Sequence, residues 1–261
     1  MHLSQNIQHN PWFLPLTINN QSSNLRLFTF HHAGGSASMF RPWAQDLTSS
    51  VDIIAIQLPG RETRFTESLL YDLKSVVNKL VENFSDYFDK PFIFFGHSVG
   101  SLISFEIVRE LRRRKYPLPL HLIVSGTRAP HLPSRRKKIR SLPDSEFISE
   151  LFSYNGIPSV LLEDKEILNL LVPIIRADFT ISETYTYSDE PPLSCPITAF
   201  GGLNDPYLLQ EELSSWKDHT NNEFKYTFFE GDHFFLTKES YSKVVYDLDL
   251  IILEETKKLI L

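Results

Sequence analysis

The chain has 261 residues, of which 42% are hydrophobic and 13% aromatic, and this is enough to bury one substantial core. Its formal net charge of −6 argues against non-specific binding to nucleic acid, which requires a basic surface. No segment approaches the roughly 18 apolar residues that a membrane span needs, and the polar start of the chain is unlike a signal peptide. With one cysteine, Cys195, expected to be a buried structural thiol, the composition predicts a single cytoplasmic domain over residues 1–261 without nucleic-acid or membrane partners.

Six short apolar runs predict the strands of a parallel sheet that is covered on both faces. They occupy residues 25–30, 51–57, 92–95, 120–125, 197–200 and 224–229. Apolar residues at three- and four-residue spacing predict helices over residues 68–88, 102–114 and 241–261. The order of these elements predicts an α/β fold with a mostly parallel central sheet flanked by helices.

Roughly 70 residues separate the fourth and fifth predicted strands, which is too many for a simple crossover. The sequence therefore predicts an insertion over about residues 132–190, placed before the fifth strand. One helix begins near Asp144, and a second, very apolar helix covers residues 161–175. We expect these helices to form a lid that lines a pocket for a hydrophobic chain. The alternative is that the insertion only extends the core.

A nucleophile motif lies between the third strand and the helix that follows it. Residues 96–100 read Gly-His-Ser-Val-Gly, and a G-x-S-x-G at a strand-to-helix turn is a nucleophile elbow that exposes its serine above the sheet. The glycines are needed because the turn is tight and larger side chains would collide with the neighbouring strand and helix. The motif therefore predicts that Ser98 is a catalytic nucleophile, and the alternative is that it only caps the helix.

An acid and a histidine follow the last two predicted strands. Asp205 comes after the strand at 197–200 and His233 after the strand at 224–229, which is the Ser, acid, His order of α/β-hydrolases. Asp232 is the weaker choice for the acid, because a residue adjacent to His233 reaches its imidazole awkwardly. Since parallel strands end at one edge of a sheet, Ser98, Asp205 and His233 are predicted to meet there.

A basic run, Arg135-Arg136-Lys137-Lys138, lies in the predicted insertion near the proposed site. Such a run can attract an acidic partner or a phosphate group. We therefore hypothesise that it helps to recruit an acidic partner or a phosphate group, and the alternative is an ordinary solvated face.

Further motifs give the chain a family resemblance. They are Leu27-Phe28-Thr29-Phe30-His31-His32-Ala33-Gly34-Gly35-Ser36-Ala37-Ser38, Leu58-Pro59-Gly60-Arg61-Glu62, Arg128-Ala129-Pro130-His131, Arg176-Ala177-Asp178-Phe179, Glu183-Thr184-Tyr185, Gly201-Gly202-Leu203-Asn204-Asp205-Pro206 and Gly231-Asp232-His233-Phe234-Phe235. With the elbow, they make the chain from about residue 25 to 235 resemble the type II thioesterases of nonribosomal peptide and polyketide synthesis. This family is related to the medium-chain thioesterases of fatty acid synthase.

The resemblance implies an α/β-hydrolase fold with a mobile lid. It also implies a monomeric enzyme that hydrolyses acyl groups from the phosphopantetheine thiol of acyl or peptidyl carrier proteins, with no metal or organic cofactor. The family's nucleophile, acid and base map to Ser98, Asp205 and His233, and its oxyanion-hole amides map to Ala33 and Val99.

Two positions depart from the family pattern. His31 stands where a proline is usual, and Ser101 replaces a frequent alanine. Neither belongs to the triad, although His31 bears on the shape of the oxyanion loop.

Two other functions use the same residues. An esterase or acyltransferase needs the same triad, because the triad specifies neither the leaving group nor the acceptor. A catalytically inactive carrier-binding module is the third reading, and the intact triad argues against it.

Overall fold

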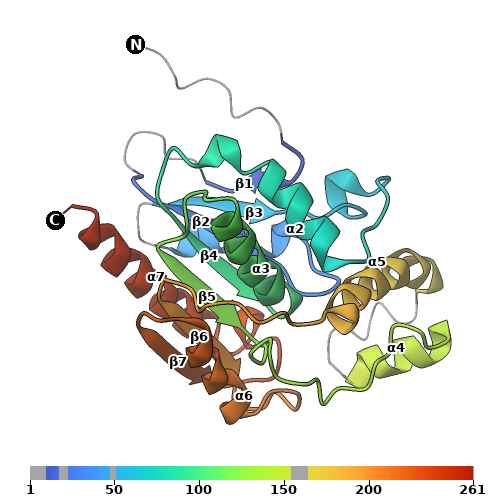
Figure 1. Ribbon diagram of the computed structural model, residues 1–261. Coiled ribbons are helices and arrows are strands. Elements are labelled where there is room, and N and C mark those ends of the chain that lie inside the picture. The colour runs from blue at the N-terminus through green and yellow to red at the C-terminus, as the bar shows by residue number, and fades with distance from the viewer. Residues whose placement is uncertain (1–9, 18–22, 48–50, 154–163, 261) are drawn as a thin grey trace.

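A seven-stranded sheet forms the centre of the protein, shown in the computed structural model of Figure 1. The structure describes residues 10–17, 23–47, 51–153 and 164–260. The strands are β1 (Phe13–Pro15), β2 (Arg26–Phe30), β3 (Asp52–Ile56), β4 (Phe92–His97), β5 (His121–Ser125), β6 (Ile197–Gly202) and β7 (Phe224–Phe229). They lie in the order β1-β3-β2-β4-β5-β6-β7, and only β1 is antiparallel to its neighbour.

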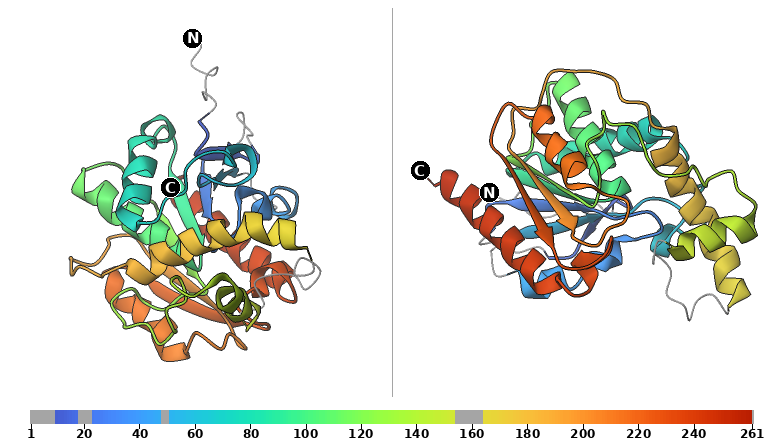
Figure 2. Two further views of the ribbon diagram at one scale, coloured as in Figure 1. Left: turned by 90° about the vertical axis from the view of Figure 1, so that its right-hand side faces the viewer. Right: turned by 90° about the horizontal axis from the view of Figure 1, so that it is seen from below.

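Helices cover both faces of the sheet, as the two views of Figure 2 show. The main ones are α1 (Trp43–Asp46), α2 (Leu73–Glu82), α3 (Val99–Arg113), α6 (Gln210–Ser214) and α7 (Tyr241–Lys258). Neighbouring residues of a strand point to opposite faces, so Phe94 packs in the core with α2 and α3, while Phe95 packs with α1 and α7. Because both faces of β2 to β6 are buried, these strands are mostly apolar, and the sheet with its helices confirms the predicted α/β class.

Elements outside the predicted insertion also differ from the sequence prediction. Helix α2 is shorter than the predicted 68–88, because it begins after Asp72, whose side chain accepts a hydrogen bond from Ser75 N at 2.8 Å. Beyond α2, Ser85–Tyr87 form a separate 3₁₀ turn. The short edge strand β1 was missed, because three residues that end at a proline give no periodic signal.

The predicted insertion contains two helices, α4 (Asp144–Ser153) and α5 (Lys165–Thr184), which lie side by side at one end of the molecule (Figures 1 and 2). The second predicted helix ended too early: α5 continues nine residues past Ile175, because Ala177 and Ile181 extend its buried stripe. Residues 161–163 of that prediction lie outside the described residues. A small core separate from the two main ones joins α4 to α5 through Phe147 and Val172.

The single cysteine is buried, as predicted. Cys195 is buried just before β6, and burial raises the pKa of its thiol to about 12, which confirms a structural thiol. Across the described residues we find no helix with the length and apolar character needed to cross a membrane.

Candidate active site

Ser98 occupies the sharp turn between β4 and α3. Its backbone has φ 56° and ψ −120°, a conformation that residues with a side chain rarely adopt. The flanking glycines permit the turn: a Cβ on Gly96 would lie 2.4 Å from Gly100 O, and one on Gly100 would lie 2.3 Å from Phe30 O. The structure therefore contains the elbow, with its glycines required by backbone contact.

Ser101 stabilises this turn through hydrogen bonds. Its buried hydroxyl donates to Gly96 O at 2.7 Å or Ser125 O at 3.0 Å and accepts from Ser125 N at 2.9 Å. The hydroxyl thus ties the elbow to the end of β5, a role that the alanine usual at this position lacks. The sequence alone does not predict this contact, because Ser101 and Ser125 are 24 residues apart.

The predicted acid and base form a buried pair. His233 Nδ1 and Asp205 Oδ2 are 2.6 Å apart, and Asp205 Oδ1 accepts from Tyr207 N at 2.9 Å. Burial alone would raise the pKa of Asp205, but its hydrogen bond to His233 and the charge of that imidazole outweigh burial and lower it. Asp205 is therefore a carboxylate at neutral pH and holds Nδ1 of the ring in its protonated form.

The alternative acid, Asp232, bonds elsewhere. Its Oδ1 accepts from Phe234 N at 2.8 Å and its Oδ2 from Lys238 Nζ at 3.0 Å. The carboxylate at the His233 imidazole is that of Asp205.

The end of β5 brings Ser98 and His233 into one neighbourhood. Ser98 N donates to Ser125 O at 2.7 Å, and a Cβ on the next residue, Gly126, would lie 3.3 Å from His233 Cε1. The ring of His97, beside Ser98 in the chain, is 5.1 Å from that of His233. The three predicted triad residues thus lie at the same edge of the sheet, where β4, β6 and β7 end.

The two predicted oxyanion-hole residues, Ala33 and Val99, line the same cavity as Ser98. Within the part of the chain that the structure describes, neither backbone amide has a hydrogen-bond acceptor. An unpaired amide is costly unless water or a ligand satisfies it. Both donors are thus available to an oxygen atom bound in the cavity.

Hydrogen bonds fix the loop after β2, residues 31–35, here called the β2 loop. His32 O accepts from Gly35 N at 3.0 Å and lies 2.8 Å from His31 Nδ1, which must therefore be the protonated nitrogen. Because a peptide unit is planar, holding His32 O also fixes the direction of the Ala33 N–H. His31 thus supports the loop where the family has a proline.

Three imidazoles, His31, His32 and His97, lie where β2 and β4 end and are called the histidine cluster; the rings of His32 and His97 are 5.9 Å apart. Burial lowers the pKa of His31 to about 3 and that of His32 to about 4, and burial also places the pKa of His97 well below its usual value. Because these rings carry no charge at neutral pH, they do not repel a positive charge that develops on His233.

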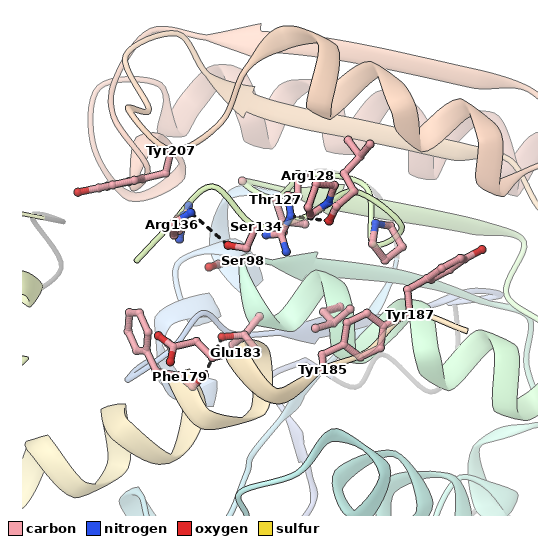
Figure 3. A pocket seen from close by; sticks show the side chains of 18 of the residues that line it. Ser98, Thr127, Arg128, Ser134, Arg136, Phe179, Glu183, Tyr185, Tyr187 and Tyr207 are labelled. Carbon is pink, nitrogen blue, oxygen red and sulfur yellow. Dashed lines mark hydrogen bonds between the residues drawn. The ribbon is translucent and has the colours of Figure 1, made fainter. Parts of the chain in front are cut away.

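A cavity of about 520 Å³ opens at Ser98 (Figure 3). In the figure, Phe179 and Glu183 of α5 lie on one side of it, with Arg128, Ser134 and Arg136 across from them. The cavity wall is therefore partly polar and basic, so the pocket predicted for a hydrophobic chain also contains groups suited to an anion.

The basic run divides into two parts. Arg135 pairs with Glu212 at 2.7 Å and is not part of the cavity lining, whereas Arg136, Lys137 and Lys138 line the cavity. Lys137 also pairs with Glu150 of α4 at 2.9 Å. Three of the four residues thus lie where the hypothesis of anion recruitment requires them.

A doubly covered parallel sheet, a serine on a strained strand-to-helix turn and a buried Asp–His pair at the same edge define an α/β-hydrolase. Residues 25–249 match the family described as thioesterase domain, which is most of the chain. The chain therefore belongs to the thioesterase family and is a hydrolase that acts on thioester bonds.

Relatives agree with this assignment. The gramicidin S biosynthesis protein GrsT of Aneurinibacillus migulanus is 41% identical over 91% of this chain and 92% of its own. The linear gramicidin dehydrogenase LgrE of Brevibacillus parabrevis is 44% identical over 82% of each chain, although the present sequence contains no dinucleotide-binding G-x-G-x-x-G.

A solved structure shows the same arrangement. The type II thioesterase BorB from the borrelidin biosynthetic cluster is 31% identical, has a TM-score of 0.83, and covers 96% of this chain and 99% of its own. The chain is thus similar to the type II thioesterases that release or edit chains in nonribosomal peptide and polyketide synthesis, as the sequence motifs predicted.

Proposed function

We propose that this thioesterase hydrolyses acyl or peptidyl chains from the phosphopantetheine thiol of carrier proteins, using Ser98, His233 and Asp205 as its catalytic triad. The observation that carries the proposal is a cavity lined by Ser98 and two acceptor-free amides, with the buried Asp205–His233 pair at the same edge of the sheet. We further propose that the enzyme is a cytoplasmic monomer that needs no metal or organic cofactor, since its substrate supplies the phosphopantetheine.

The reaction begins when Ser98 attacks the thioester carbonyl carbon. His233 Nε2 takes the serine proton, because its other ring nitrogen is held at Asp205. The carbonyl oxygen becomes an oxyanion that the amides of Ala33 and Val99 stabilise, and each such donor is worth roughly 3–4 kcal/mol. The attack therefore needs no preformed alkoxide.

Collapse of this intermediate expels the thiol and leaves an acyl group on Ser98. A thiol has a pKa near 8.5, so it leaves with less help from a proton donor than an alcohol needs. His233 then activates a water molecule that hydrolyses the acyl-serine. The products are the free acid and the carrier with its thiol restored.

The basic lining of the cavity supports an acidic carrier or its phosphate as the partner. Arg136, Lys137 and Lys138 lie on the cavity wall beside the insertion helices, so an anionic group can approach Ser98 past them. Such charges raise the rate of encounter and fix orientation more than they add raw affinity.

The test is release of an acyl group from a phosphopantetheinylated carrier protein. The comparison uses the native enzyme and Ser98→Ala. Each enzyme is also assayed on a small thioester and on a matched oxygen ester. We expect Ser98-dependent release that is faster from the carrier than from the small thioester. Dialysis against a chelator and sedimentation analysis test the expected lack of a metal and the monomer.

Two outcomes contradict the proposal. Faster turnover of the oxygen ester, or transfer to a non-water acceptor, would make the protein an esterase or acyltransferase. A Ser98 that fails to react with a fluorophosphonate would make it a carrier-binding module.

A further inference from the structure

A buried ion pair joins two motifs to which the sequence analysis gave no role. Arg61, in the loop after β3, donates to Asp178 of α5 through both ends of its guanidinium group, from Nη1 to Oδ2 at 2.8 Å and from Nη2 to Oδ1 at 2.9 Å. Both side chains are buried. A two-point pair of this kind fixes orientation as well as distance.

The same two side chains hold the β2 loop. Asp178 Oδ2 accepts from Gly34 N at 2.7 Å, and Arg61 Nη1 donates to Gly35 O at 3.0 Å. One carboxylate oxygen of α5 thus bonds at the same time to the loop and to Arg61.

Close packing at Gly34 leaves no space between the β2 loop and α5. This residue has φ +74°, and a Cβ on it would lie 2.7 Å from Ile175 Cγ1, so α5 rests directly on the loop backbone. A larger residue at this position would push the helix and the loop apart.

The geometry connects α5 to the proposed oxyanion donor through adjoining peptide units. Asp178 fixes the Ala33–Gly34 unit by its N–H, while the next residue, Gly35, donates to His32 O and so fixes the unit that carries the Ala33 N–H. Displacing α5 would remove the acceptor of Gly34 N and release both units.

We propose that Arg61 and Asp178 are positioning residues that place the Ala33 amide for the oxyanion and couple its position to helix α5 of the insertion. This inference rests on the proposed function, because it concerns the same site. Neither residue needs to touch the substrate. The oxyanion hole is complete only while α5 lies on the β2 loop, so the insertion influences the rate of the chemical step as well as access to the cavity.

The experiment compares Asp178→Ala with a matched control, Asp52→Asn. Asp52 is also a buried carboxylate, paired with Lys90 at 2.9 Å, but it begins β3 at the opposite edge of the sheet. Measurements are kcat and KM on a small thioester, the affinity for a trifluoromethyl ketone that forms a tetrahedral adduct with Ser98, and thermal stability.

We expect Asp178→Ala to lower kcat by about 30-fold or more with little change in KM, because misplacing one oxyanion donor costs on the order of 10²-fold. Affinity for the ketone should fall by a similar factor. Asp52→Asn should lose stability and keep kcat within about threefold. The Arg61→Ala/Asp178→Ala double variant should be no slower than the worse single variant, since the two act as a unit.

A normal kcat in Asp178→Ala, or an equal loss in Asp52→Asn, would overturn the inference. If Asp178→Ala does not fold, Asp178→Asn gives the same comparison, because it keeps the shape and removes the charge that pairs with Arg61. The rate at which a fluorophosphonate labels Ser98 gives a readout that needs no thioester. This rate should fall in the Asp178 and Arg61 variants but not in Asp52→Asn. Native enzyme that is labelled but hydrolyses no thioester would refute the proposed function and leave the coupling testable by that rate.

Discussion

Replacing Asp205 by asparagine tests the most constrained contact of the site. The change keeps the size of the side chain but removes the charge that lies 2.6 Å from His233 Nδ1. The amide can also turn its NH₂ group toward Nδ1, which then becomes an acceptor and moves the ring proton to Nε2. An imidazole in that form cannot take the proton of Ser98.

The structure sets the size of the expected loss. Opposite charges with centres about 4 Å apart attract by about 4 kcal/mol at an effective dielectric constant of 20, and this attraction supports the imidazolium formed during attack. The loss of this attraction combines with the effect of a proton on the wrong ring nitrogen. We therefore expect kcat to fall by about 10⁴-fold, equivalent to about 5.5 kcal/mol. Steady-state hydrolysis of a small thioester, with a thermal melt of each variant, measures this.

Asp232→Asn is the matched control, since it changes a carboxylate next to His233 that bonds to Phe234 N and Lys238. It should keep kcat within about threefold. A loss below about tenfold in Asp205→Asn, or a larger loss in Asp232→Asn, would refute the assignment of the acid.

Three further predictions concern the carrier, the pH dependence and the elbow. Lys138→Ala should raise KM for a carrier-bound substrate by about threefold or more and leave a small thioester unaffected, whereas Lys257→Ala, on α7, removes one charge without either effect; equal changes for both substrates would contradict anion recruitment. Two members of the histidine cluster, His31 and His32, have pKa values of about 3 and 4, so the folded protein binds fewer protons there than the unfolded chain. Their contribution to stability is therefore fully present above the unfolded pKa near 6.5 and is lost as the pH falls toward the folded values. Urea unfolding should therefore show stability falling by about 1.4 kcal/mol per pH unit for each such histidine below pH 6.5, and a flat profile from pH 7.5 to 5 would be inconsistent with buried neutral rings. Gly100→Ala should lower the free energy of unfolding by at least about 2 kcal/mol, because its Cβ would lie 2.3 Å from Phe30 O, and an unchanged melting temperature would show that the turn can relax.

Much of the fold was predictable because the sheet is covered on both faces. A strand buried on both sides is mostly apolar, so the sequence marks β4 by the apolar run at residues 92–95. The ends of helices depend on single contacts: Asp72 caps α2 and shortens it, and no pattern of apolar spacing reveals that. The edge strand β1 is specified by pairing with β3 and not by its own sequence.

The site was predictable where one chain segment carries the signal. Ser98 is marked by its glycines, and Asp205 and His233 by their positions after strands. Arg61 and Asp178 are 117 residues apart, and each alone is an ordinary charged residue in a short motif. A buried charge requires an opposite charge nearby, but other charged residues adjoin both positions in the sequence, so the sequence does not show which charges are buried.

The contacts of Asp178 also bear on why the insertion lies between β5 and β6. An insertion there begins at the carboxyl edge of the sheet, where Ser98 and Asp205 stand, so its helices reach the β2 loop before the chain returns to the start of β6. Ile175 and Asp178 lie one turn apart on α5, and both contact Gly34, one by packing and the other by a hydrogen bond. Gly34 must therefore lack a side chain both to adopt its positive φ and to admit the helix. A helix that served only as a wall of the pocket would need neither the buried ion pair nor this close approach to the loop backbone.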